Sequence, residues 1–167
     1  MKLRLSFSIL FLCLLSVFAG TSNTSFAQAP ASITEDKVMA IMNSVDRATR
    51  KGNIAGIVAP LASNVKIKMT VSTAKSDKEQ VINLTKDQYT FFTKRAFRRR
   101  IAYQLERKNT RVKIYEGSQT AMVTSDLYES LTIPQGTLRA VSSEVAIFNL
   151  RDGRIWITSI DSRTRFY

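Results

Sequence analysis

Apolar residues, mostly β-branched or aromatic, are concentrated near the end of the chain, where residues 144–161 predict a β-hairpin. Asp152 and Gly153 form a favoured type I′ turn, because both central residues of such a turn have positive φ, and β-branched and aromatic residues flank them. A loop of these two residues predicts that Glu144 faces Asp161 across the hairpin. Apolar side chains then lie on both faces near the turn, so the sheet needs a cover on each side.

Apolar residues at helical spacing dominate the start of the domain. Residues 32–35 match a capping box, which opens a helix that Gly52 is suited to end. Asn53 is placed to cap a short helix over residues 54–61, and this segment carries no charge. The short helix is therefore expected to be largely buried.

Most of the remaining chain predicts strands, with one more helix among them. Residues 65–71 predict a strand with its odd-numbered residues toward the core, and the polar stretch 72–83 predicts an exposed loop or lid. Residues 85–88 form a second capping box and open a third helix. Four long strands follow as a meander, with a bulge at 108–110, over residues 101–115, 119–132, 138–150 and 154–165. Helices early and strands late predict an α+β fold, in which a strongly twisted sheet curls around the helices.

Residues 1–27 have the three zones of a secretory signal. Lys2 and Arg4 give the positive start, residues 5–19 are an apolar run, and small residues precede a cut after Ala27. A retained membrane anchor is the alternative, but the run is shorter than the roughly 20 residues of a spanning helix. We therefore expect an exported protein, periplasmic or secreted and without a membrane span after cleavage. A linker at 28–33 would then precede one domain at 34–167.

The chain carries 25 lysines and arginines against 13 aspartates and glutamates, and loss of Lys2 and Arg4 with the signal lowers the formal charge from +12 to +10. This balance favours anionic partners, although export and the lack of a recognition motif argue against nucleic acid. The sequence has no histidine, and its one cysteine, Cys13, lies within the signal. These counts exclude Ser-His-Asp and Cys-His catalysis and the usual zinc sites, so no cofactor and no metal are expected.

Residues 52–61 and 84–89, with the closing strands around 120–124 and 152–157, resemble the nuclear-transport-factor-2-like superfamily. This group includes SnoaL-like polyketide cyclases, ketosteroid isomerases and scytalone dehydratases, and the resemblance covers nearly all of the domain. It implies a cone-shaped half-barrel of curved, mostly antiparallel sheet around about three N-terminal helices, with a pocket between helices and sheet. It also implies a homodimer through the outer face of the sheet. The acidic pair and the histidine of many enzymatic relatives have no counterparts at residues 63–64 and 159–161, so no catalytic set carries over.

Four carboxylates are the candidates for acid–base catalysis, namely Asp46, Asp126, Glu144 and Asp161. A three-residue loop at 134–136 would place Asp126 opposite Glu144, and the three strand carboxylates would form a row that raises the pKa of its members. The alternative is that the row faces solvent or is neutralised by Arg139, Arg163 and Arg165. Asp46 either enters a pocket from the first helix or pairs with Arg50, four residues on.

Two other groups of side chains are candidates for binding. The first is a set of aromatic and thioether side chains that either line an apolar pocket or pack in the core, namely Met69, Tyr89, Phe92, Phe97, Tyr103, Tyr128 and Trp156. The second is a basic cluster at the end of the third helix, made of Lys94, Arg95, Arg98, Arg99 and Arg100. This cluster either binds an anion or an anionic surface, or it is a solvated helix end whose cations complement the helix dipole.

The first hypothesis from these patterns is an exported, non-catalytic domain that binds a small ligand, apolar or anionic, or another protein. The alternative is a small enzyme of the isomerase, cyclase or dehydratase kind that uses pocket carboxylates and tyrosines. A weaker alternative is a binder of anionic polymer or surface through the basic cluster.

Overall fold

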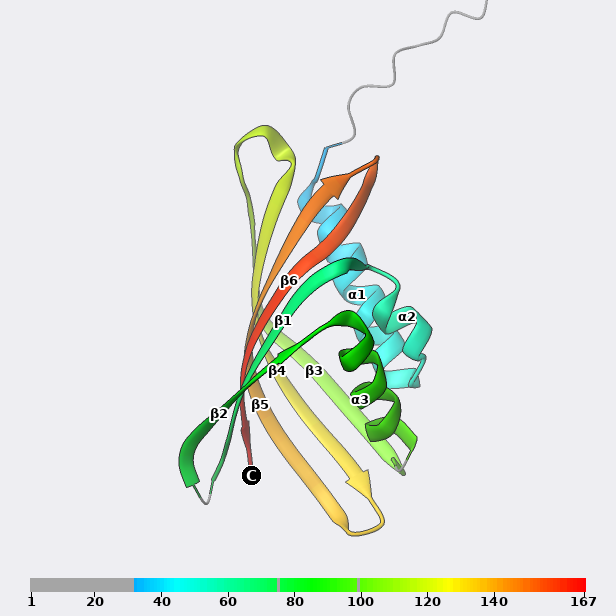
Figure 1. The fold of residues 1–167 in the computed structure, drawn as a ribbon, viewed down its shortest axis with the longest axis vertical. Helices are drawn as coiled ribbons and strands as arrows, with labels where there is room; N and C mark the ends of the chain where they lie inside the picture. Colours follow the sequence, from blue (N-terminus) through cyan, green and yellow to red (C-terminus); the bar gives the residue numbers. More distant parts are fainter. Residues whose placement is uncertain (1–31, 75, 99) are drawn as a thin grey trace, which may run out of the picture.

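Three helices pack against one face of a strongly twisted, six-stranded sheet (Figure 1). This computed structural model describes residues 32–74, 76–98 and 100–167, so the expected signal at 1–27 and most of the linker lie outside the described residues. The strand order is β2-β1-β6-β5-β4-β3. The β1–β6 pair is parallel and the other four pairs are antiparallel, so the sheet is mixed and open at β2 and β3.

The helices precede most of the strands, as the α+β prediction requires. The elements in chain order are α1 (Glu35–Lys51), α2 (Ile54–Val58), β1 (Leu61–Thr73), β2 (Ser76–Leu84), α3 (Lys86–Arg98), β3 (Ala102–Ile114), the 3₁₀ turn η1 (Glu116–Ser118), β4 (Thr120–Ile133), β5 (Gly136–Arg151) and β6 (Arg154–Phe166). None of the helices in the described part of the chain is long and apolar enough to cross a membrane.

Local capping chemistry sets the helix ends. α1 is capped by Thr34 rather than by Ser32, because the amide of Ile33 donates to a carbonyl outside the helix and the first turn starts after it. Gly52 ends α1 with a φ of 68°, the left-handed conformation that glycine adopts without strain. At α3 the predicted capping box is confirmed, since the Thr85 and Gln88 side chains each accept from the other residue's backbone amide at 3.3 and 2.9 Å.

The loop predicted over residues 72–83 is wrong, because Ser76–Leu84 forms strand β2 and pairs with β1. β2 is an edge strand with a neighbour on one side only. Much of it faces water, with Val81 54% exposed. An edge strand tolerates polar residues on both faces, so its sequence lacks the alternation of a half-buried strand.

The last two hairpins of the meander, β4–β5 and β5–β6, have turns of two residues. The β5–β6 turn has positive φ at Asp152 and Gly153, 52° and 71°, which confirms the turn prediction. In the β4–β5 hairpin, Ile133 pairs with Gly136, so the loop is one residue shorter than predicted. The shorter loop shifts the register by one residue.

A β-bulge corrects the predicted register of the last hairpin. One extra residue in β6, Thr158, lies between the partners of Ile147 and Phe148. Pairs near the turn are as predicted, but beyond the bulge Glu144 faces Ser162 instead of Asp161. A bulge inserts one unpaired residue, and the pattern of apolar residues does not reveal it when both faces are apolar.

The packed core lies between α1 and the central strands. Its buried residues are Ile33, Val38, Met42, Leu61, Val65, Ile67, Ala121, Val123, Ala146, Phe148 and Ile157. Burial of Val65 and Ile67 confirms that the odd-numbered residues of β1 face inward. The core fills one end of the space between the helices and the sheet, and the other end is hollow.

Candidate functional site

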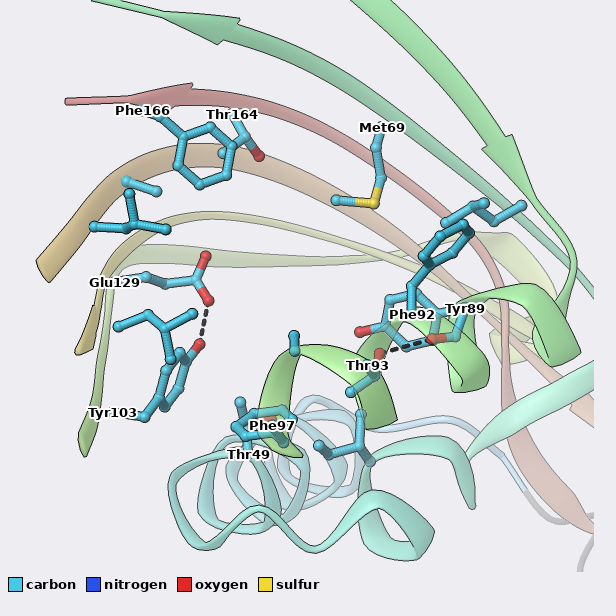
Figure 2. Close-up of a pocket in the computed structure, with 16 residues that line it drawn as sticks. Thr49, Met69, Tyr89, Phe92, Thr93, Phe97, Tyr103, Glu129, Thr164 and Phe166 are labelled. Carbon is cyan, nitrogen blue, oxygen red and sulfur yellow. Dashed lines mark hydrogen bonds between the residues drawn. The ribbon is translucent and has the colours of Figure 1, made fainter. Parts of the chain in front are cut away.

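The hollow end is a cavity of about 310 Å³ between α3 and the inner face of the sheet (Figure 2). Its wall is mainly apolar and aromatic. The larger side chains around it are Met69, Tyr89, Phe92, Phe97, Tyr103, Leu131, Leu138 and Phe166. A volume of this size lies at the small end of the range for ligand pockets, so the cavity suits a small organic molecule.

A phenol and a carboxyl group form the main polar feature of the cavity wall. The Tyr103 hydroxyl on β3 donates a hydrogen bond to Glu129 on β4 (Figure 2). Burial raises the pKa of Glu129, the bond from Tyr103 lowers it in part, and the charge of Glu144 raises it again. Burial and the charge of Glu129 also raise the pKa of the Tyr103 hydroxyl. A carboxyl group with a raised pKa in an apolar cavity can bind a ligand's polar group or exchange a proton with it.

Tyr89 adds a second phenol, supplied by the first turn of α3. Burial, and then the charges of Glu144 and Glu129, raise the pKa of Tyr89 to about 12. The Thr93 hydroxyl one turn later donates to the Tyr89 carbonyl at 2.7 Å. Tyr89 is therefore a neutral phenol at ordinary pH, available as a hydrogen-bond donor.

The raised pKa of Glu129 predicts a measurable dependence of stability on pH. Because the pKa of Glu129 is higher in the folded than in the unfolded protein, proton binding by Glu129 adds to the free energy of unfolding at acid pH. This contribution is lost as the pH rises from the unfolded pKa through the folded pKa. Glu129→Gln keeps an acceptor for Tyr103 but does not titrate. We therefore expect the free energy of unfolding of the variant, relative to the wild type, to rise between about pH 4 and about pH 8. Urea unfolding at both pH values measures this change.

The matched control for that experiment is Glu106→Gln, which removes an exposed carboxylate from the same region of the sheet. Glu106 pairs with Lys108 at the surface, so the variant should change the free energy of unfolding by less than about 1 kcal/mol at either pH. A Glu129→Gln effect that is independent of pH would contradict the assignment of a titrating carboxyl group to the cavity wall.

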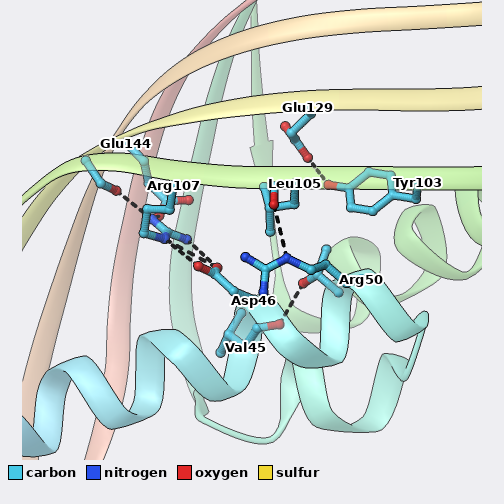
Figure 3. A network of polar contacts seen from close by, with 10 residues as sticks. Val45, Asp46, Arg50, Tyr103, Leu105, Arg107, Glu129 and Glu144 are labelled. Carbon is cyan, nitrogen blue, oxygen red and sulfur yellow. Dashed lines mark hydrogen bonds and ion pairs between the residues drawn. The ribbon is translucent and has the colours of Figure 1, made fainter.

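A buried ion network lies beside the cavity, on the side of the packed core (Figure 3). Arg107 on β3 binds Asp46 of α1 through Nε and Nη2 at 3.0 and 2.9 Å, and Glu144 of β5 through Nη1 at 2.8 Å. The same Nη1 donates to the Ser125 hydroxyl at 2.5 Å. Burial alone would lower the pKa of Arg107, but the bonds and charges of Asp46 and Glu144 raise it overall. Arg107 is therefore a fixed cation that binds two carboxylates at once, the buried Asp46 and the partly buried Glu144.

The four carboxylates proposed from the sequence do not come together in the cavity. Asp46 and Glu144 bind Arg107 instead, and Arg50, the expected partner of Asp46, donates to the Leu105 carbonyl at 3.0 Å. Asp46 is 4% exposed, so its carboxylate is buried in contact with Arg107 and does not face the cavity.

The other two candidates lie on the outer face of the sheet. Asp126 accepts from Asn109 and Ser143 at 2.8 and 3.2 Å, and Asp161 pairs with Lys68 at 3.2 Å. The predicted row of three carboxylates does not form, because the shorter loop and the bulge separate its members. In the described part of the chain, no group of three or more acidic, histidine or cysteine side chains is arranged to hold a metal ion.

The structure places five of the seven proposed pocket residues at the cavity wall, namely Met69, Tyr89, Phe92, Phe97 and Tyr103. Tyr128 and Trp156 lie on the opposite face of the sheet, each beneath a cation, Lys108 at 5.1 Å and Arg154 at 3.9 Å. Glu129 was missed. Four apolar residues of β4, Ala121, Val123, Leu127 and Leu131, are odd-numbered, and this parity places residue 129 on the inner face and residue 128 on the outer face.

The basic cluster is divided by the structure. Lys94, Arg95 and Arg98 are exposed on α3. Arg100 instead donates to the carbonyls of Thr49 and Arg50 at 3.3 Å, and its guanidinium leaves no room for a Cβ at Gly52. It therefore closes the C-terminus of α1, where a cation complements the helix dipole. Arg99 lies outside the described residues.

The curved sheet, the helices on its inner face and the cavity between them define an α+β domain of the ligand-pocket type. The chain has the nuclear-transport-factor-2-like fold, as its solved neighbours show. A protein of this fold from Cytophaga hutchinsonii superimposes with a TM-score of 0.60 and 11% identity over 78% of this chain and 98% of that one. A conserved protein from Planctomyces limnophilus gives 0.62 and 13% over 78% and 94%.

A hexachlorocyclohexane dehydrochlorinase, LinA-type3 from Novosphingobium barchaimii, has a TM-score of 0.59 and 8% identity over 76% of this chain and 83% of that one. No protein-family model and no curated protein matches the sequence. The structural similarity establishes the fold. At sequence identities this low, the function must be argued from the site.

Proposed function

We propose that the protein is an exported domain that binds a small, largely apolar molecule carrying one hydrogen-bonding group. The observation that carries this proposal is an apolar cavity whose wall presents a hydrogen-bonded phenol and carboxyl group, Tyr103 and Glu129. The pairing of Asp46 and Glu144 with Arg107 supports a binding role, because it removes two candidate catalytic groups from the cavity.

The geometry also suggests which ligand chemistry fits. In this proposal the sheet is a cone-shaped half-barrel, and the ligand enters its wide end beside α3. An apolar body contacts Phe97 and Phe166, while a hydroxyl or carbonyl group contacts the Tyr103–Glu129 pair. Tyr89 offers a second donor on the α3 side. Apolar contact supplies affinity and the few polar groups fix orientation, as in most small-molecule sites.

A neutral fluorescent probe tests the proposal. N-phenyl-1-naphthylamine is apolar and gains fluorescence when it leaves water. Ala96 lines the cavity from α3 with only a methyl group, so Ala96→Phe places a ring in the space. We expect the variant to bind the probe about tenfold more weakly or worse, a loss of at least roughly 1.4 kcal/mol.

Ala55→Phe is the matched control, because Ala55 is exposed on α2 and does not line the cavity. It should bind the probe like the wild type. Equal binding by all three proteins, or no binding by the wild type, would count against the cavity as a ligand site.

A second candidate is an enzyme of the isomerase, cyclase or dehydratase kind. The raised pKa of Glu129 in an apolar cavity favours it, since general acids and bases are tuned in this way. We rank it second because the chain has no histidine and the known proteins it resembles share only the fold. Once a ligand is found, a reaction that Glu129→Gln abolishes while binding persists would move this candidate to first place.

We also propose that the domain forms a homodimer through the outer face of the sheet. Val145 and Tyr128 on that face are 36% and 40% exposed. Contact with a second copy would cover the second apolar face that the hairpin sequence predicts. Light scattering of the purified protein should give twice the mass of one chain, and a monomer mass would reject this part of the proposal.

A further inference from the structure

The outward face of α3 combines phenylalanine and cations. Phe91, Lys94, Arg95 and Arg98 are spaced at i, i+3, i+4 and i+7, which places them on one side of a helix. The cavity-lining residues Tyr89, Thr93 and Phe97 lie on the other side. α3 has no fully buried residue, so this helix covers the cavity with one face and presents the other to the surroundings.

Large apolar side chains on this face are exposed. Phe91 is 60% exposed, Phe92 is 50% exposed and their rings meet edge to face at 5.7 Å. Ile101, just beyond the end of the helix, is 68% exposed. Single exposed apolar residues are ordinary, but three close in sequence beside a basic cluster are typical of an interaction surface.

The charge on this face has one sign over most of its length. From Gln88 to Ile101 the sequence contains five lysines and arginines and no acidic residue. Asp87 is the acidic residue of the first turn, where it complements the helix dipole. Arg100 is engaged at the end of α1, which leaves Lys94, Arg95 and Arg98 as the described, exposed cations of the helix.

We propose that this α3 face, made of Phe91, Phe92, Lys94, Arg95, Arg98 and Ile101, docks on the surface of a bilayer that contains anionic lipids. The three cations would contact lipid phosphates, and the phenyl and isoleucyl side chains would enter the interfacial layer, as in amphipathic helices that lie on membranes. A soluble polyanion would engage the cations equally well, but it offers no apolar layer for Phe91. The exposed rings therefore favour a bilayer over an anionic polymer.

Sedimentation with lipid vesicles tests this inference on the purified protein. Vesicles of phosphatidylcholine alone are compared with vesicles that also contain phosphatidylglycerol. We expect binding to the anionic vesicles, little binding to the neutral ones, and weaker binding as salt screens the cations. The experiment does not depend on the cavity being occupied, so it is independent of the proposed ligand-binding function.

Two variants separate the contribution of the cations to vesicle binding from that of the exposed phenyl ring. Replacing Lys94, Arg95 and Arg98 by glutamine should lower binding to anionic vesicles about a hundredfold. Phe91→Ala should lower it about tenfold while leaving all charges in place. The charge-matched control lies away from α3 and from the outer face of the sheet: it places glutamine at Lys37 and Arg47 of α1 and at Arg151 beside the β5–β6 turn, where all three side chains are exposed.

Each other outcome overturns the inference. Equal losses in the triple variant and its charge-matched control would show attraction by net charge alone. Binding that needs the three cations but is unchanged by Phe91→Ala, and that heparin abolishes, would identify an anionic polymer site. Absence of binding to anionic vesicles at low salt would exclude a membrane surface altogether.

Discussion

Arg107→Met is expected to lower the free energy of unfolding by about 3–5 kcal/mol, the usual cost of removing one partner from a buried ion pair. The variant leaves Asp46 and Glu144 inside the protein without their counter-ion, and the side chains of these two residues are 6% and 16% exposed. Methionine fills much of the arginine's volume, so the loss reports on charge more than on packing.

Lys68→Met is the matched control, because Lys68 and Asp161 form an ion pair whose side chains are 50% and 51% exposed. Exposed pairs contribute little, so this change should cost less than about 1 kcal/mol. Urea unfolding of both variants at one pH measures the contrast. Equal costs would show that the Arg107 network is no more important for stability than a surface pair.

The network lies at the boundary between the packed part of the interior and the hollow part. Ser125, Glu144 and Ser162 face one another across three strands, so a polar row crosses the inner face of the sheet. Arg107 reaches this row from β3 and joins it to Asp46 on α1. The apolar core ends at this row, and the cavity with Glu129 begins beyond it.

Features decided by neighbouring residues were predictable from the sequence. The Thr85–Gln88 capping box, Gly52 at the end of α1 and the Asp152-Gly153 turn each depend on contacts within a few residues. The bulge near Asn109, with its φ of 51°, was also predicted from turn-forming residues inside an alternating strand. The sequence resemblance gave the fold family for the same reason, since its motifs mark helix starts and strand turns.

Features decided by distant residues were not predictable. Asp46 has Arg50 four positions away in sequence, yet it binds Arg107, 61 residues later, because the twist of the sheet brings β3 beneath α1. The prediction of the carboxylate row was wrong because one bulge and one shorter turn each shift the strand register by a single residue. Glu129 is different, because the parity of β4 already places it on the inner face, but a single carboxyl group forms no pattern of paired charges across strands.

The second large effect is expected for Phe148→Ala, which should lower the free energy of unfolding by about 3–5 kcal/mol. Phe148 is 0% exposed at the centre of the packed end, opposite Ala121 on β4 and Ile157 on β6. Truncation leaves a void that these neighbours are too small to fill. Thermal or urea unfolding measures the loss, and binding of N-phenyl-1-naphthylamine is measured below the transition.

Phe92→Ala is the matched control, because it removes the same ring from the hollow end, where Phe92 is 50% exposed. It should cost about 1 kcal/mol or less in stability, since much of that ring already contacts water. It should weaken probe binding, while Phe148→Ala should leave probe affinity near the wild-type value. If both variants lost stability and binding in the same proportion, the interior would be one continuous core; opposite patterns would show that the polar row at Arg107 divides a supporting core from a binding cavity.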